Sequence, residues 1–157
     1  MRGIMIAALL AGPPGSADAF CAGLKRIVDA GPDGFVGVPL TLPNPVDPAT
    51  PFTCEIEPGT LDEAVHEEHP DFVCEARKPE SADSDARLER DADALDDIIQ
   101  KCALPGATAT GRNGIATPNA VIGVGITFLN DERVTPSVAT SGLRITVHRR
   151  RSGADAA

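Results

Sequence analysis

The sequence predicts an α+β domain in which one antiparallel sheet of about five strands carries two main helices on a single face. Residues 21–30 and 84–102 space their apolar side chains at helical intervals. Several other segments alternate apolar and polar residues, as half-buried strands do. Four cysteines in a chain of 157 residues predict two disulfides that staple the fold. The predicted order of elements is α-β-β-β-α-β-β.

The first helix is predicted over residues 21–30, where Cys21, Leu24 and Val28 fall on one stripe and a Gly-Pro pair follows as a stop signal. Residues 35–43 predict the first strand. The prolines that come next favour an extended connection rather than a helix. They are Pro43, Pro45, Pro48 and Pro51.

Two similar phrases, PFTCEIEP at residues 51–58 and DFVCEARKP at residues 71–79, predict the two strands of one antiparallel hairpin. Apolar residues alternate with polar ones in both phrases, so each strand has one face toward a core. Placing the two cysteines opposite each other sets the register. The predicted pairs on the core side are Phe52 with Ala76, Cys54 with Cys74, and Ile56 with Phe72.

Two further helical signals are present, one between the two hairpin strands and one after them. In the connection at residues 58–70, Thr60 and Glu63 form a Thr-x-x-Glu capping box, which predicts about two helical turns before Pro70. Residues 84–102 predict the main second helix, which Ser84 is expected to cap. The apolar seam of this helix is formed by Leu88, Ala92, Leu95, Ile99 and Cys102.

The C-terminal third of the chain predicts a long hairpin. Residues 107–119 are small, polar and glycine-rich and predict a loop, whereas residues 120–131 and 141–149 alternate as strands do. The Gly-Val-Gly at Gly123 to Gly125 lies inside a strand, so it is not a phosphate-binding loop. Glycines at such positions indicate that a helix or a neighbouring strand approaches closely.

The predicted elements suggest which cysteines pair. If the two helices pack antiparallel, Cys21 at the start of the first meets Cys102 at the end of the second, and Cys54 lies opposite Cys74 across the hairpin. The sequence therefore favours Cys21–Cys102 and Cys54–Cys74. Two other pairings stay open, because all four cysteines point inward and a directly opposed pair demands a narrow geometry. They are Cys21–Cys54 with Cys74–Cys102, and Cys21–Cys74 with Cys54–Cys102.

The N-terminus has the pattern of a signal peptide. A positive start precedes a nine-residue apolar core at residues 3–11, and Ala17 and Ala19 supply small residues before a cut at Phe20. The apolar core is too short to span a bilayer, and no later segment is apolar enough, so no membrane span is expected in the mature chain. The predicted organisation is a cleaved signal peptide at 1–19, a single domain at 20–149 and a flexible tail at 150–157.

Composition narrows the classes of function. The net charge of −9 disfavours a nucleic-acid partner, and arginine outnumbers lysine eleven to three, as in GC-rich bacterial genomes. We therefore expect a periplasmic or secreted bacterial protein with a non-enzymatic binding or structural role. Its expected partner is a protein or another envelope component. A cationic partner fits the charge, and an inhibitor of a cationic cell-wall hydrolase is the specific alternative.

A second alternative is a metal-binding protein or hydrolase that uses His66 and His69. Their spacing of three residues allows one helix face, but zinc needs a third ligand and usually a fourth, which the sequence does not assign. The segment also lacks the His-Glu-x-x-His pattern of zinc proteases. No catalytic residue or cofactor is predicted, because no nucleophile motif is present and adjacent carboxylates on a helix point apart.

Overall fold

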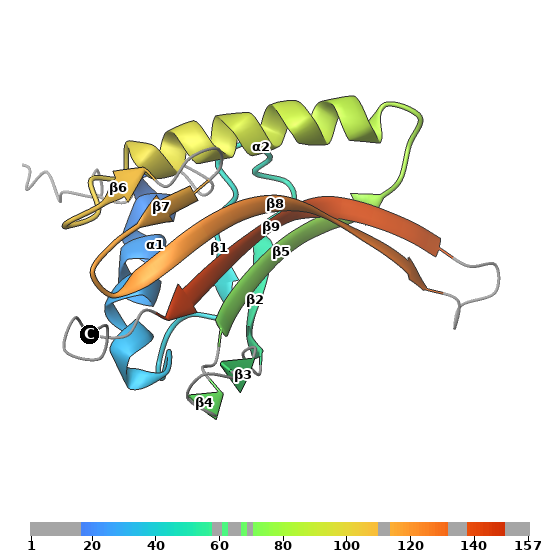
Figure 1. Ribbon diagram of the computed structural model, residues 1–157. Helices are drawn as coiled ribbons and strands as arrows, with labels where there is room; N and C mark the ends of the chain where they lie inside the picture. Colours follow the sequence, from blue (N-terminus) through green and yellow to red (C-terminus); the bar gives the residue numbers. More distant parts are fainter. Residues whose placement is uncertain are drawn as a thin grey trace, which may run out of the picture.

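The computed structural model describes residues 17–57, 61–62, 67–68, 71–109, 114–131 and 138–149. Its main sheet has seven antiparallel strands, not the predicted five or so, in the order β1-β2-β5-β9-β8-β7-β6 (Figure 1). The predicted signal peptide lies outside this part of the chain up to residue 16, and so does the predicted tail at 150–157. The elements are α1 (Ala17–Asp29), the 3-10 turn η1 (Gly31–Asp33), β1 (Thr41–Leu42), β2 (Phe52–Glu57), β3 (Leu61–Asp62), β4 (Glu67–Glu68), β5 (Asp71–Pro79), α2 (Ser84–Gln100), β6 (Thr108–Ala109), β7 (Gly114–Ala116), β8 (Ala120–Asp131) and β9 (Val138–Arg149).

Both helices pack on the same face of the sheet, as predicted. Leu24 and Ile27 of α1 and Leu95 and Ile99 of α2 are buried in one core cluster with the inward residues of the strands. Each such side chain contributes about 1.5 to 3 kcal/mol when fully buried. The helix predicted from residue 21 begins four residues earlier, at Ala17.

The predicted cap at Ser84 is wrong. α2 begins at Ser84, the N-cap position is Asp83, and no side chain caps the helix there. The Ser84 hydroxyl instead accepts a hydrogen bond from the backbone N–H of Ser81 at 2.7 Å. The hydroxyl therefore stabilises the turn that precedes α2. It does not accept a hydrogen bond from the free backbone amides of the first helical turn.

The structure confirms both favoured disulfides. Cys21 in the first turns of α1 is bonded to Cys102, two residues after α2, and their Cα atoms lie 5.1 Å apart. Cys54 on β2 is bonded to Cys74, which lies directly opposite on β5. One bridge thus ties the two helices together and the other ties two strands, and both lie on the covered face of the sheet.

The register predicted for the hairpin is confirmed at Cys54 opposite Cys74 and at Ile56 opposite Phe72. The burial expected for Ile56 is wrong, because its side chain is 47% exposed. β1 pairs only with the first two residues of β2, so Ile56 lies near the uncovered end of an edge. Phe72, on the next strand inward, is fully buried.

β8 and β9 form the predicted long hairpin, with twelve residues in each strand, and β9 begins at Val138, three residues before its predicted start (Figure 1). β9 also pairs with β5, and this pairing joins the N-terminal and C-terminal halves of the chain into one sheet. The backbone of Ala76 approaches Gly142 of β9 so closely that any Cβ at position 142 would collide with it. A glycine is therefore required at this point of the pairing between β9 and β5.

The strand predicted at residues 35–43 is wrong over most of its length. Only Thr41–Leu42 is a strand, because the preceding backbone turns through left-handed conformations at Gly34, Phe35 and Gly37. Glycine adopts such a conformation readily, but a phenylalanine does so at a cost in strain. The Phe35 ring is buried against Phe72, with ring centroids 5.6 Å apart, and this contact offsets that cost.

Two connections contain strands where other structure was predicted. β3 and β4 form a separate two-stranded ribbon, so the helical turns predicted there are wrong for these residues. A short isolated helix gains few hydrogen bonds to offset its nucleation, whereas the ribbon lies between two strands that are already paired. Likewise, β6 and β7 replace much of the predicted loop and extend one edge of the sheet.

Candidate binding face of the sheet

The face of the sheet opposite the helices, here called the outer face, carries most of the charged residues of the central strands. Side chains alternate between the two faces of a strand, so the residues between the buried ones point outward. β2, β5 and β9 lie side by side, and their outward residues therefore share one surface. They are Thr53, Glu55 and Glu57 on β2, Asp71, Val73, Glu75 and Arg77 on β5, and Arg144, Thr146 and His148 on β9.

Arg144 links all three strands. One of its guanidinium nitrogens, Nη1, lies 3.2 Å from Glu75 Oε1, and the other, Nη2, lies 3.2 Å from Glu57 Oε2. Because β5 lies between β9 and β2, the guanidinium crosses over β5 to reach Glu57. Val73, between these partners, is only 2% exposed although it points outward, which we attribute to the arginine lying above it.

One more ion pair and one contact between a histidine and a carboxylate lie on the same face. Arg77 pairs with Glu75, which therefore contacts two cations. At the other end, His148 Nδ1 lies 2.9 Å from Asp71 Oδ1. Surface pairs of this kind stabilise a fold by only about 0 to 1 kcal/mol each, but together they hold the side chains in one arrangement.

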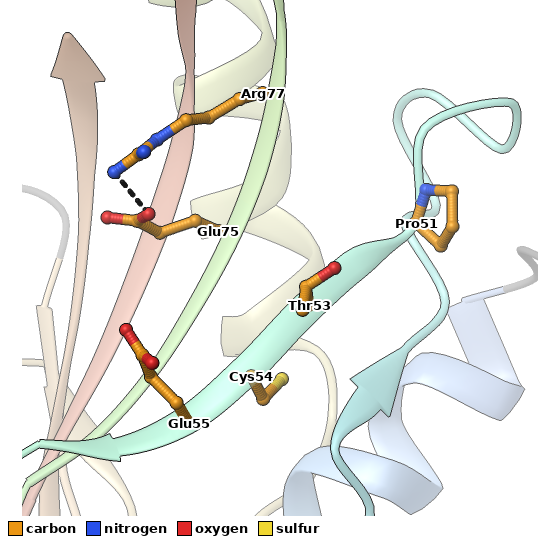
Figure 2. Close-up of a pocket in the computed structure, with 6 residues that line it drawn as sticks. All are labelled: Pro51, Thr53, Cys54, Glu55, Glu75 and Arg77. Carbon is orange, nitrogen blue, oxygen red and sulfur yellow. Dashed lines mark ion pairs between the residues drawn. The ribbon is translucent and has the colours of Figure 1, made fainter. Parts of the chain in front are cut away.

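Glu55 is the carboxylate of this face that has no side-chain partner among the described residues. Its side chain is exposed, and it makes no ion pair or hydrogen bond with any residue that the structure describes. It borders an open hollow of about 350 Å³ between β2 and β5. Figure 2 shows Glu55, Glu75 and Arg77 on one side of the sheet, with the Cys54 sulfur on the other. The hollow is lined by Pro51, Thr53, Cys54, Glu55, Glu75 and Arg77.

The glycines of β8 leave the neighbouring part of the outer face bare. A Cβ added at Gly123 or Gly125 would meet nothing within 4 Å. The close approach of a helix or strand predicted for this segment is therefore wrong. The outer face thus has a charged half on β2, β5 and β9 and an uncharged half on residues 121–129 of β8.

The candidate metal ligands His66 and His69 lie outside the described residues. The two residues between them form β4, so the helical spacing considered for this segment does not apply to Glu67 and Glu68. Within the described ranges, no group of three or more His, Cys, Asp or Glu side chains is arranged to hold a metal ion. In the same part of the chain, no helix is long and apolar enough to cross a bilayer.

Two shifted titratable groups lie away from the outer face. Burial raises the pKa of Asp96 on α2, and Gln100 Nε2 partly opposes this by donating a hydrogen bond at 2.8 Å. The hydrogen bond from Lys78 lowers the pKa of Asp47, whose Oδ2 lies 2.6 Å from the lysine Nζ. Burial accounts for the first shift and a hydrogen bond from a lysine for the second, so neither shift by itself indicates catalysis.

The ion pairs on the outer face depend on a strand pairing that the sequence does not show. Alternation in each strand identifies Glu55, Glu57, Glu75 and Arg144 as outward residues, but only the pairing of β5 with β9 brings them together. Comparison with known proteins adds no further constraint: no family model matches the chain, and no curated protein or solved structure is detectably similar to it. The site can therefore offer a cationic group the free carboxylate of Glu55, which is surrounded by side chains that are already paired with one another.

Proposed function

We propose that this protein is an exported, non-enzymatic binding protein that holds a cationic partner on its outer face. The observation that carries this proposal is Glu55, a carboxylate with no cation among the described residues, beside an open hollow. The other glutamates of the face are paired with its two arginines, so they orient the site without competing for the partner. A lysine or arginine side chain from a partner would complete the set.

The charge of the whole chain supports the same partner class. At −9, the chain attracts a cationic protein over a distance comparable to the Debye length, so association speeds up at low salt. An inhibitor of a cationic cell-wall hydrolase is one specific member of this class. Both bridges, together with the signal-peptide pattern, favour a periplasmic or secreted bacterial protein.

Binding of an oligolysine peptide and of a cationic lysozyme to the purified domain tests the proposal. We expect both to bind, with an association rate that falls between about 50 mM and about 300 mM salt. Glu55→Gln should weaken binding roughly threefold to fivefold, since one rim charge contributes about 1 kcal/mol or less. The matched control Glu89→Gln removes the same charge from the exposed side of α2 and should change affinity less.

Affinity that does not depend on salt, or equal losses in the two variants, would contradict the proposal. The metal-binding alternative is separated in the same series by a metal titration of the wild type and of the H66Q/H69Q variant. Stoichiometric zinc uptake that disappears in this variant, with oligolysine binding absent from both proteins, would replace the proposed function with that alternative.

A further inference from the structure

We propose that the free edge of β8 pairs with the same edge of a second copy of this chain. β7 pairs with β8 only through residues 121–123, so within the described part of the chain residues 124–131 have no strand on that side. β6 returns along the other side of β7, with Ala109 opposite Ile115, and does not extend this edge. The longest strand of the sheet, equalled only by its partner β9, therefore leaves unpaired amide and carbonyl groups along much of its length.

The free edge has the features that promote strand addition. Residues 124–130, with the sequence VGITFLN, contain no charge and no proline, whereas natural edges usually carry lysine, proline or a bulge against pairing. Phe128 is 59% exposed and Leu129 is 44% exposed, one on each face of the strand. The opposite edge is protected, since β1 has two residues and prolines 39 and 43 flank it.

A second copy fits this edge better than an unrelated strand because the edge is complementary to itself. A two-fold axis at Thr127 pairs residues 124–130 of both copies and leaves β7 undisturbed, since only Asp131 would then fall opposite a residue, Gly123, that β7 already pairs. Phe128 then lies opposite Ile126 of the second copy. Leu129 lies opposite Gly125 of the second copy, where a Cβ would meet nothing within 4 Å. In this pairing, Phe128 of one copy contacts an apolar residue of the other, and Leu129 occupies the open space beside the glycine of the other.

The distribution of charge also allows two acidic chains to meet here. The strand order places the outer-face glutamates two and three strands from β8. At about 4.8 Å per strand, those of the two copies are more than about 20 Å apart. This separation exceeds the Debye length of about 8 Å at physiological salt, so their mutual repulsion is screened.

The test combines oligomeric state with register. In sedimentation velocity over a range of concentrations, the wild type should show a reversible dimer. Gly125→Leu fills the space needed by Leu129 of the second copy and should weaken the dimer at least about tenfold. Gly123→Leu is the matched control, because a Cβ there also meets nothing within 4 Å in the monomer, but the residue lies opposite β7. Thr127→Cys, on the axis, should form a dimer-linking disulfide under mild oxidation, whereas Thr146→Cys on β9 should not.

Three outcomes would overturn the proposal. The first is a wild-type protein that stays monomeric at all concentrations. This includes the case in which the free edge binds an unrelated extended peptide and no second copy. The second is a dimer that Gly125→Leu leaves unchanged while the variant keeps the wild-type melting temperature. The third is equal cross-linking of the two cysteine variants, which would place the contact elsewhere even if Gly125→Leu failed to fold.

Discussion

The two faces of the sheet are built from alternate residues of the same strands, yet they have different roles. On the covered face, Phe52, Phe72 and Ile145 are fully buried under the two helices, and both disulfides lie there. On the outer face, Arg144 and Glu75 form ion pairs in contact with solvent. Burial stabilises far more than exposed ion pairs do. Substitutions on the covered face should therefore change stability, and those on the outer face should change binding.

The largest expected effect comes from the bridges of the covered face. Removal of Cys21–Cys102 as a double alanine variant should lower the free energy of unfolding by about 4 to 5 kcal/mol, and removal of Cys54–Cys74 by about 3 kcal/mol. The difference arises because the bridges close loops of 81 and 20 residues. Urea unfolding of both variants measures the two losses, and a larger loss for the shorter loop would contradict this ranking.

Two phenylalanines on the same face test whether cover by the helices decides stability. Phe72 is fully buried, whereas Phe128 lies farther along the sheet and is 59% exposed. Phe72→Ala should destabilise the fold by about 3 to 5 kcal/mol, and Phe128→Ala by less than about 1 kcal/mol. Thermal unfolding, measured at a concentration where the wild type is monomeric, separates them. Similar losses of stability in the two variants would mean that cover by the helices does not decide how much a phenylalanine of this face stabilises the fold.

Arg144→Met should move stability and binding in opposite directions. Loss of the guanidinium leaves Glu57 and Glu75 with fewer cation partners, so unfolding should become easier by about 1 kcal/mol. The same change makes the outer face more acidic and should tighten oligolysine binding roughly threefold. Arg90→Met on the exposed side of α2 is the control for charge alone. If binding weakened instead, the arginine itself would contact the partner.

The smallest expected effect depends on pH. Asp96 is 9% exposed, and burial raises its pKa, so ionisation of this group favours the unfolded state. Its stabilising contribution is complete when the carboxyl is protonated in both states, and it is lost as pH rises through the folded-state pKa. Asp96→Asn should therefore stabilise the fold at pH 7 by about 0.5 kcal/mol and have little effect in acid. The side-chain carbonyl oxygen of the asparagine can still accept the hydrogen bond from Gln100. A variant that is less stable than the wild type at pH 7 would therefore contradict a raised pKa at Asp96.

The parts of the fold that were predicted correctly are those with long, regular patterns. α2 and the strands from residues 120 and 141 repeat their periods several times, and the spacing of Cys54 and Cys74 matches the register of the hairpin. β6 and β7 are two and three residues long, which is too short for any period to be visible. Their strand conformation comes from pairing with β8, which is a tertiary effect.

The candidate site was predictable only in part for a similar reason. Glu55 and Glu75 could be assigned to the polar face of their strands from alternation alone. Nothing local shows that Arg144, 69 residues after Glu75, belongs to the neighbouring strand. Phe35 is a further case: the glycines and the proline around it indicate a turn, but they do not show that the phenylalanine itself has a left-handed backbone and a buried ring.

The two bridges are nested, with Cys54–Cys74 enclosed between Cys21 and Cys102. A chain that enters an oxidising compartment with its N-terminus first presents Cys21 and then Cys54, so oxidation in order of arrival joins the wrong pair. Native pairing then requires either that the sheet forms before the thiols are oxidised or that thiol–disulfide exchange corrects the first bridge. If the second route operates, an oxidase alone leaves mispaired chains, and the yield of protein with both native bridges should rise when a disulfide isomerase is supplied with it.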